Sequence, residues 1–124
     1  MIRIKRLAKA LLIVPIEWLE HAPVLAKAFA GSGTGSRSVY VALLRDEDGR
    51  HGVYVGQTGK ERDRRFEEHK TGYKASKYVR KYGVALLPRV QNHLTDLEAQ
   101  EANEIEAGLA AAFRNTGIWT EGGH

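Results

Sequence analysis

The pattern of apolar and polar positions divides the chain into two parts. Apolar residues over positions 1–30 recur about every three to four residues, which predicts helices. Positions 31–38 are rich in Gly and Ser, a composition typical of a flexible linker. We therefore expect a helical arm and its linker in residues 1–37 and a folded domain in residues 38–124.

Short runs of β-branched and aromatic residues follow the linker. Val39–Leu44 and Val53–Val55 form two such runs, separated by a polar loop that contains an Asp-Gly pair. This arrangement predicts an antiparallel hairpin. A third apolar run over residues 84–90 predicts another strand, and Pro88 within it favours a position at the edge of the sheet.

Helical patterns occupy the remaining segments of this domain. Residues 60–71 and 75–81 have helical composition. Thr95, with Glu98 three residues later, matches a capping box and predicts the start of a last helix that ends at Gly117. The order strand, strand, helix, helix, strand, helix predicts an α+β fold, with a small three-stranded antiparallel sheet flanked by helices and preceded by a helical N-terminal arm.

Composition narrows the class of protein. The chain has 124 residues, a length suited to one domain, and carries a formal net charge of +4. It contains no cysteine, which excludes disulfides, thiolate metal sites and a cysteine nucleophile. No apolar run approaches the roughly 20 residues that a membrane-spanning helix needs. We therefore expect a cytoplasmic protein with no membrane partner.

The charges are segregated along the chain. From His69 to Lys81 there are five basic residues and no acidic one, whereas Val90 to Phe113 carries acidic residues and no Lys or Arg. Tyrosines are interleaved with the basic residues, a mixture that suits contact with nucleic acid. The alternative is the solvated face of an amphipathic helix. The candidate nucleic-acid-binding residues are Lys70, Lys74, Lys77, Arg80 and Lys81.

Some side chains form a set suited to phosphodiester cleavage. Tyr40 and Tyr54 lie on the two hairpin strands, and Arg65 and His69 are four residues apart on one helix face. The last helix adds carboxylates. An arginine can neutralise a phosphoryl oxygen, a carboxylate can bind a divalent cation, and a phenol can activate water. For the tyrosines, packing on the sheet is the plain alternative.

Four motifs follow one another along the chain: Ser38-Val-Tyr40, Val53-Tyr54-Val55-Gly56, Arg65 with His69 and Gly72, and the final carboxylate-bearing helix. In this order, over about residues 38–117, they resemble the GIY-YIG nuclease family. The similarity implies a three-stranded sheet flanked by helices, one divalent metal held by a glutamate, and hydrolysis of DNA phosphodiester bonds without a covalent intermediate.

This resemblance also implies a role for each residue. Tyr40 and Tyr54, one or both, would orient or deprotonate the attacking water. Because a free phenol has a pKa near 10, that role requires stabilisation of the phenolate. Arg65 would neutralise charge on the scissile phosphate, and His69 would bond the phosphate or shuttle a proton.

The metal ligand has two candidates. Glu106, followed by apolar residues three, four and seven positions later, resembles the family pattern and is the preferred ligand for Mg²⁺ or Mn²⁺. Glu101 remains the competitor because helical phase places it nearer the apolar stripe. His124 matches a polar position that many members fill with asparagine, or is simply the end of the chain.

These observations predict a metal-dependent endonuclease acting on DNA. The alternative is a catalytically inactive nucleic-acid-binding module on the same fold. A third reading is a protein-interaction domain whose basic N-terminal arm docks on a partner. We also expect the arm to contact a second copy of the chain or another protein, because a domain of about 90 residues offers little surface for reading a long site.

Overall fold

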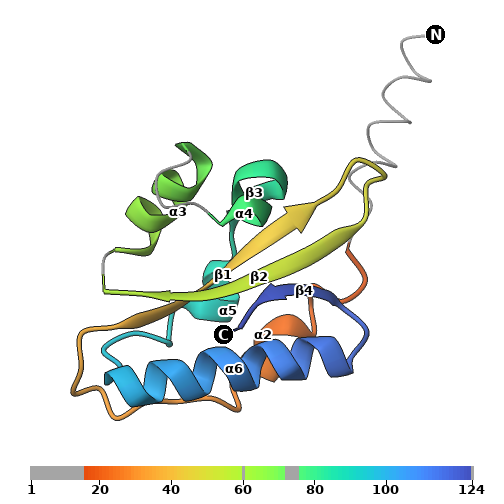
Figure 1. Ribbon diagram of the computed structural model, residues 1–124. Helices are drawn as coiled ribbons and strands as arrows, with labels where there is room; N and C mark the ends of the chain where they lie inside the picture. The colour runs from red at the N-terminus through yellow and green to blue at the C-terminus, as the bar shows by residue number, and fades with distance from the viewer. Residues whose placement is uncertain (1–15, 60, 72–75, 124) are drawn as a thin grey trace, which may run out of the picture.

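The computed structural model describes residues 16–59, 61–71 and 76–123. Figure 1 shows a single sheet with helices on both of its faces. Several features singled out in the sequence lie outside the described residues: residues 1–15 of the predicted arm, Gly72, Lys74 and His124.

The sheet has four strands in the order β3-β1-β2-β4. β1 (Ser38–Arg45) and β2 (His51–Thr58) form the predicted antiparallel hairpin, with Tyr40 opposite Gly56. β3 (Gly83–Leu86) pairs antiparallel with β1, and β4 (Trp119–Gly122) pairs parallel with β2. The α+β class is confirmed.

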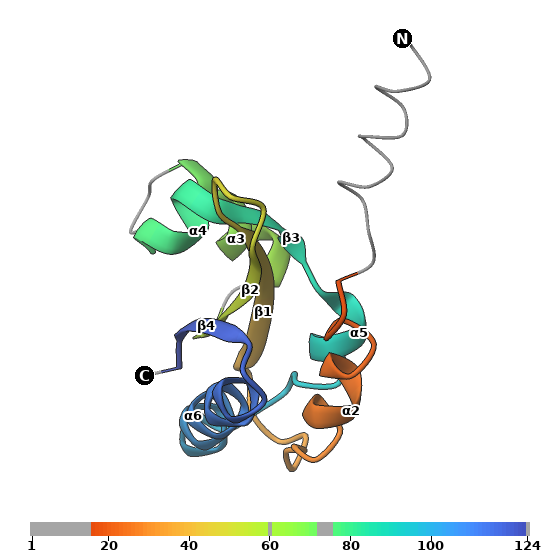
Figure 2. The same cartoon turned by 90° about the vertical axis from the view of Figure 1, so that its right-hand side faces the viewer.

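Helices cover the two faces of the sheet unequally. α3 and α4 lie on one face, and α2 and the long helix α6 lie on the other (Figures 1 and 2). Within the described residues, no helix is long and apolar enough to cross a membrane. The helices are α2 (Ala22–Ala26), α3 (Arg62–Thr71), α4 (Lys77–Tyr82), α5 (Pro88–Gln91) and α6 (Ala99–Asn115).

Strand alternation separates the core from the candidate site. Val39 and Val41 of β1 and Val53 and Val55 of β2 are fully buried in the same hydrophobic core as the apolar stripe of α6. Because successive side chains point to opposite faces of a sheet, the intervening tyrosines point toward α3 and α4. The core therefore fills one face, and the hairpin tyrosines lie on the other.

The predicted three-stranded antiparallel sheet is wrong in strand count and in direction. After Gly117, whose φ of 82° ends α6, the chain returns to pair parallel with β2 from Gly52↔Trp119 to Val55↔Gly122. β4 has four residues, and its partner lies more than sixty positions earlier in the sequence. So short a run carries little local signal, because its stability comes from β2 and α6.

Two predicted element boundaries also need correction. The third strand ends at Leu86, and Pro88 begins α5, since proline suits the first turn of a helix. The capping box of α6 pairs Glu98 with Glu101, not Thr95 with Glu98. The Thr95 hydroxyl bonds instead to that of Ser38 (3.0 Å).

The predicted flexible linker is packed against the start of α6. The Ser32 backbone N–H donates to Glu101 Oε2 (2.7 Å), and its hydroxyl donates to Oε1 (2.9 Å). Arg37 exchanges two backbone hydrogen bonds with Leu97 (2.9 and 2.8 Å). Ala22 and Ala26 of α2 are fully buried in the core that α6 helps to form. The described part of the predicted arm therefore shares its core with the domain.

Substituting Glu101 tests this packing. Glu101→Ala removes a capping carboxylate and the acceptor for Ser32, so we expect the melting temperature to fall. Glu104→Ala is the control. The Glu104 carboxylate accepts a hydrogen bond from Gln100 on the exposed face of α6 (2.9 Å), so the substitution removes a carboxylate from the same helix without removing a contact to the linker. Thermal unfolding should show a clearly larger loss for Glu101→Ala. Equal losses would contradict the role assigned to Glu101.

Candidate active site

Three aromatic rings from three elements meet on the α3 and α4 face of the sheet. The centroids of Tyr40 and Tyr54 lie 6.0 Å apart, with an angle of 24° between the rings. The His69 ring lies 5.9 Å from that of Tyr40 and 6.1 Å from that of Tyr54. Residues predicted as a group from β1, β2 and α3 thus form one cluster.

The hydrogen bonds of His69 fix where its proton lies. Nδ1 accepts the backbone N–H of Ser76 (2.8 Å), and Nε2 lies 2.8 Å from the Tyr40 hydroxyl oxygen. Burial, and secondarily the nearby Arg65 charge, lower the pKa of His69, which favours the neutral ring. A neutral imidazole that accepts at Nδ1 carries its proton on Nε2, so His69 donates to Tyr40.

Tyr40 is held as a neutral phenol. Its side chain is only 2% exposed, and this burial is the main cause that raises the pKa of Tyr40, followed by the neighbouring Tyr54. Arg65 lowers the same pKa and Glu106 raises it.

Two hydrogen bonds and a ring contact link the members of the cluster. The Ser76 N–H donates to His69, His69 donates to Tyr40, and the Tyr40 ring stacks against that of Tyr54. Tyr54 is half-buried, whereas Tyr40 and His69 are each 2% exposed. Tyr54 is therefore the more accessible of the two tyrosines.

Gly56 is required for this arrangement because the Tyr40 ring lies across it. A Cβ atom at this position would stand 2.4 Å from both Cζ and Oη of Tyr40. Real side chains do not approach so closely, and the Tyr40 side chain is enclosed by its neighbours. The glycine of the Val-Tyr-Val-Gly motif therefore leaves space for the tyrosine of the paired strand.

Arg65 projects from α3 into the same region. Its guanidinium forms an ion pair with Glu68 (3.5 Å between Nη1 and Oε1), and its side chain is 20% exposed. The Arg65 charge lowers the pKa values of both Tyr40 and His69, so Arg65 acts electrostatically on the cluster. Arg65 and His69 are four residues apart in α3, and the Arg65 charge acts on His69, as expected for two residues on the same face of a helix.

The two candidate metal ligands have different surroundings. Glu106 is 5% exposed, and its Oε2 accepts a hydrogen bond from Gln57 Nε2 (2.6 Å). The Gln57 amide is oriented in turn by Arg37 Nε, which donates to its oxygen (2.9 Å). Glu106 lies on α6, so its charge acts on Tyr40 from the core face of the sheet, opposite the face that holds the aromatic cluster. Both oxygens of Glu101, by contrast, accept hydrogen bonds at the start of α6. Gln57 is a residue that the sequence analysis missed.

Of the predicted nucleic-acid-binding residues that the structure describes, Lys70 and Lys81 have partners on other elements. Lys70 Nζ donates to the carbonyl oxygen of Gly83 (2.9 Å), which joins α3 to the end of α4. Lys81 Nζ lies 3.5 Å from a carboxylate oxygen of Glu47 in the hairpin loop. These two ammonium groups stabilise contacts between elements, in addition to any contact with a ligand.

Lys77 and Arg80 are both exposed on α4, but their positions differ. Lys77 borders a hollow of about 350 Å³ that Tyr54 also lines, and Arg80 is not among its lining residues. Of the basic residues predicted to bind nucleic acid, Lys77 is therefore the one placed beside the aromatic cluster among the residues the structure describes.

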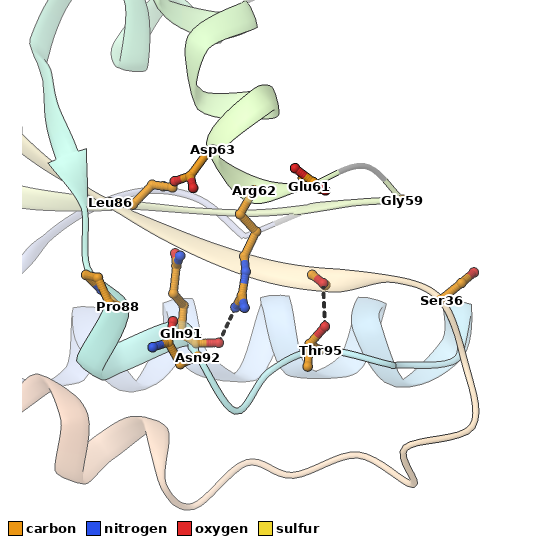
Figure 3. A pocket seen from close by; sticks show the side chains of 11 residues that line it. Ser36, Gly59, Glu61, Arg62, Asp63, Leu86, Pro88, Gln91, Asn92 and Thr95 are labelled. Atoms are coloured by element: carbon orange, nitrogen blue, oxygen red, sulfur yellow. Dashed lines mark hydrogen bonds between the residues drawn. The ribbon is translucent and has the colours of Figure 1, made fainter.

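A second hollow, of about 510 Å³, lies elsewhere and contains none of the predicted catalytic residues (Figure 3). Arg62 reaches from the start of α3 into this hollow and donates to the carbonyl oxygens of Gln91 and Val39 (3.4 Å to the latter). Gln91 is 4% exposed and accepts the N–H of Val41 (2.8 Å). Arg62 therefore connects α3 to α5 and β1 by hydrogen bonds. The sequence did not predict this structural role, because Arg62 lies in a segment with other arginines.

Comparisons of the chain with models of known protein families, with curated proteins and with solved structures found no match. Similarity to the GIY-YIG family therefore stays a prediction from the motif residues. The chemistry of this protein has to be inferred from the geometry of the cluster itself.

Gly56→Ala tests the close approach of the Tyr40 ring. The added methyl group would overlap Tyr40, so we expect the free energy of unfolding to fall by about 1–3 kcal/mol. Gly59→Ala is the control, because a Cβ atom there would lie 3.5 Å from its nearest neighbour, Arg37 Nη1. Urea denaturation should separate the two variants, and equal stabilities would contradict the packing.

The lowered pKa of His69 predicts a dependence of stability on pH. Between that lowered value and about 6.5 the unfolded chain binds more protons than the folded one, so stability falls as the pH drops below about 6.5. We expect His69→Gln to weaken this dependence in thermal unfolding at pH 5–8. Burial also lowers the pKa of His51, so His51→Gln measures its separate contribution. An unchanged pH dependence in His69→Gln would exclude the buried neutral state.

Proposed function

We propose that this protein is a metal-dependent endonuclease of the GIY-YIG type that hydrolyses DNA phosphodiester bonds. One observation carries the proposal. Tyr40, Tyr54 and His69 form an aromatic cluster in which His69 is hydrogen-bonded to Tyr40. The charge of Arg65 acts on Tyr40 from α3, on the same face of the sheet, and that of Glu106 acts on it from α6, on the other face. These residues come from β1, β2, α3 and α6, and together they supply the groups that phosphodiester hydrolysis needs.

In this proposal Tyr54 contacts the attacking water. Its side chain is the more accessible of the two tyrosines and lines an open hollow. Proton transfer from the water to a phenol oxygen needs a positive charge nearby, and Arg65, whose charge acts on the neighbouring Tyr40, would supply it. Tyr40 is too deeply buried for this contact, so it is a positioning residue that orients Tyr54.

His69 acts through Tyr40, not on the phosphate. Both of its ring nitrogens are engaged in hydrogen bonds, and the side chain is 2% exposed. Arg65 is the group suited to the substrate, because its guanidinium is partly exposed and always charged. It would stabilise the charge that develops on the phosphoryl oxygens during attack.

The residues near Glu106 fit a cation that takes few protein ligands. Among the described residues there is no group of three or more His, Cys, Asp or Glu side chains able to hold a metal. Mg²⁺ and similar hard cations commonly use one or two carboxylates and complete their shell with waters and substrate phosphates. Glu106, oriented by Gln57, meets that need. A bound cation would supply charge neutralisation at the phosphate.

DNA cleavage assays test the proposal. Supercoiled plasmid and branched DNA should be cut in Mg²⁺ or Mn²⁺ and spared in chelator. Tyr54→Phe, Arg65→Ala and Glu106→Gln should each lower the cleavage rate by about 10²- to 10⁴-fold while the protein stays folded, because each removes a group that acts on the reacting atoms.

Neighbouring residues of the same type provide matched controls. Tyr82→Phe, Arg64→Ala and Glu104→Gln should retain activity close to that of the unmodified chain. A pure preparation that binds DNA but cuts no form of it with either metal would contradict the enzyme and favour the inactive binding module. If Glu101→Gln abolishes cleavage and Glu106→Gln does not, the metal-ligand assignment is wrong.

A further inference from the structure

The hollow beside Tyr54, which we call the α4–β4 groove, is built from elements far apart in the sequence. Its volume is about 350 Å³, and the start of α4, the end of α6 and β4 form its walls. Gly122 of β4 approaches Tyr54 so closely that a Cβ atom there would lie 3.2 Å from Cε2 of the tyrosine. The lining residues used below are Tyr54, Lys77, Tyr78, Arg114, Glu121 and Gly122.

Two cations face the α4–β4 groove from opposite walls. Lys77 is exposed on α4, and Arg114 lies at the end of α6. One guanidinium nitrogen of Arg114 donates to the carbonyl oxygens of Gly122 (2.9 Å) and Thr120 (3.4 Å), which holds the group against β4. A guanidinium has five N–H donors, so this anchoring leaves others directed away from those carbonyls.

Arg114 is the first Lys or Arg after the stretch from Val90 to Phe113, which contains neither residue type. One carboxylate opposes the two cations, that of Glu121, and its Oε2 accepts a hydrogen bond from Trp119 Nε1 (2.9 Å). The ionised groups that line the groove therefore sum to one positive charge.

We propose that the α4–β4 groove binds the sugar–phosphate backbone of the DNA strand next to the scissile phosphate, with Lys77 and Arg114 contacting its phosphates. This inference rests on the proposed nuclease function. The groove begins at Tyr54, so a strand whose phosphodiester bond is attacked there continues along it. Tyr78 is half-buried in its wall, and Lys77 Nζ lies 5.1 Å from the centroid of its ring, which keeps the ammonium beside the groove.

Equilibrium binding in chelator tests the groove without cleavage. The probe is a fluorescein-labelled branched DNA, titrated with the full chain over a series of salt concentrations. Lys77→Ala should weaken binding about three- to tenfold at 0.1 M salt and reduce the slope of log K against log[salt] by about 0.7–0.9, because one phosphate contact is lost. Arg114→Gln should act similarly.

The opposite charge and a distant charge give the controls. Glu121→Gln should tighten binding, because it removes the carboxylate that opposes the phosphates. Lys27→Ala removes the same charge as Lys77→Ala, but Lys27 is exposed at the end of α2, on the other face of the sheet and outside the groove lining, so the affinity and the slope should stay unchanged. Melting temperatures verify that each variant is folded, and Lys77→Ala and Glu121→Gln remain informative if Arg114→Gln loosens β4.

The outcomes separate this inference from the proposed function. If the unmodified chain cuts DNA but Lys77→Ala, Arg114→Gln and Glu121→Gln leave the affinity and slope unchanged, the groove is not the binding site. Equal weakening by Lys77→Ala and Lys27→Ala would also overturn it, because binding would then be a diffuse effect of net charge. A chain that neither binds nor cuts DNA would overturn the nuclease proposal as well.

Discussion

The Tyr40 ring lying across Gly56 is the contact on which the candidate site depends. The register of β1 and β2 places the two residues opposite each other, and the missing Cβ of Gly56 lets the phenol reach His69. His69 in turn accepts the backbone N–H of Ser76. One buried set of polar groups thus joins the hairpin to α3 and to the start of α4, and the positions of four elements are mutually constrained.

Because Tyr40 and His69 are buried, their hydrogen bonds are strong, and losing one of them would destabilise the fold. A buried hydroxyl or imidazole without a partner destabilises a fold by about 1–3 kcal/mol. Among the described residues, every buried side-chain nitrogen and oxygen has a hydrogen-bond partner. The site differs from a plain hydrophobic face in this respect, because the buried residue of α3 is His69, whose hydrogen bond to Tyr40 holds the helix over the sheet.

Local patterns predicted the parts of the fold that local interactions stabilise. The hairpin and the main helices followed from periodicity, and spacing singled out Tyr40, Tyr54 and His69, which the fold brings together. β4 escaped prediction because its four residues depend on pairing with a distant strand. Gln57 and Arg114 escaped for the same reason, since their partners lie on other elements and no sequence motif marks them.

Ser76 takes part in two contacts at once. Its side chain caps α4 by accepting the N–H of Val79, while its own backbone N–H donates to Nδ1 of His69 and fixes the tautomer of that ring. A shift of the first turn of α4 would therefore also disturb the hydrogen bond that orients His69 toward Tyr40. The helix cap and the imidazole are coupled through the backbone of one residue.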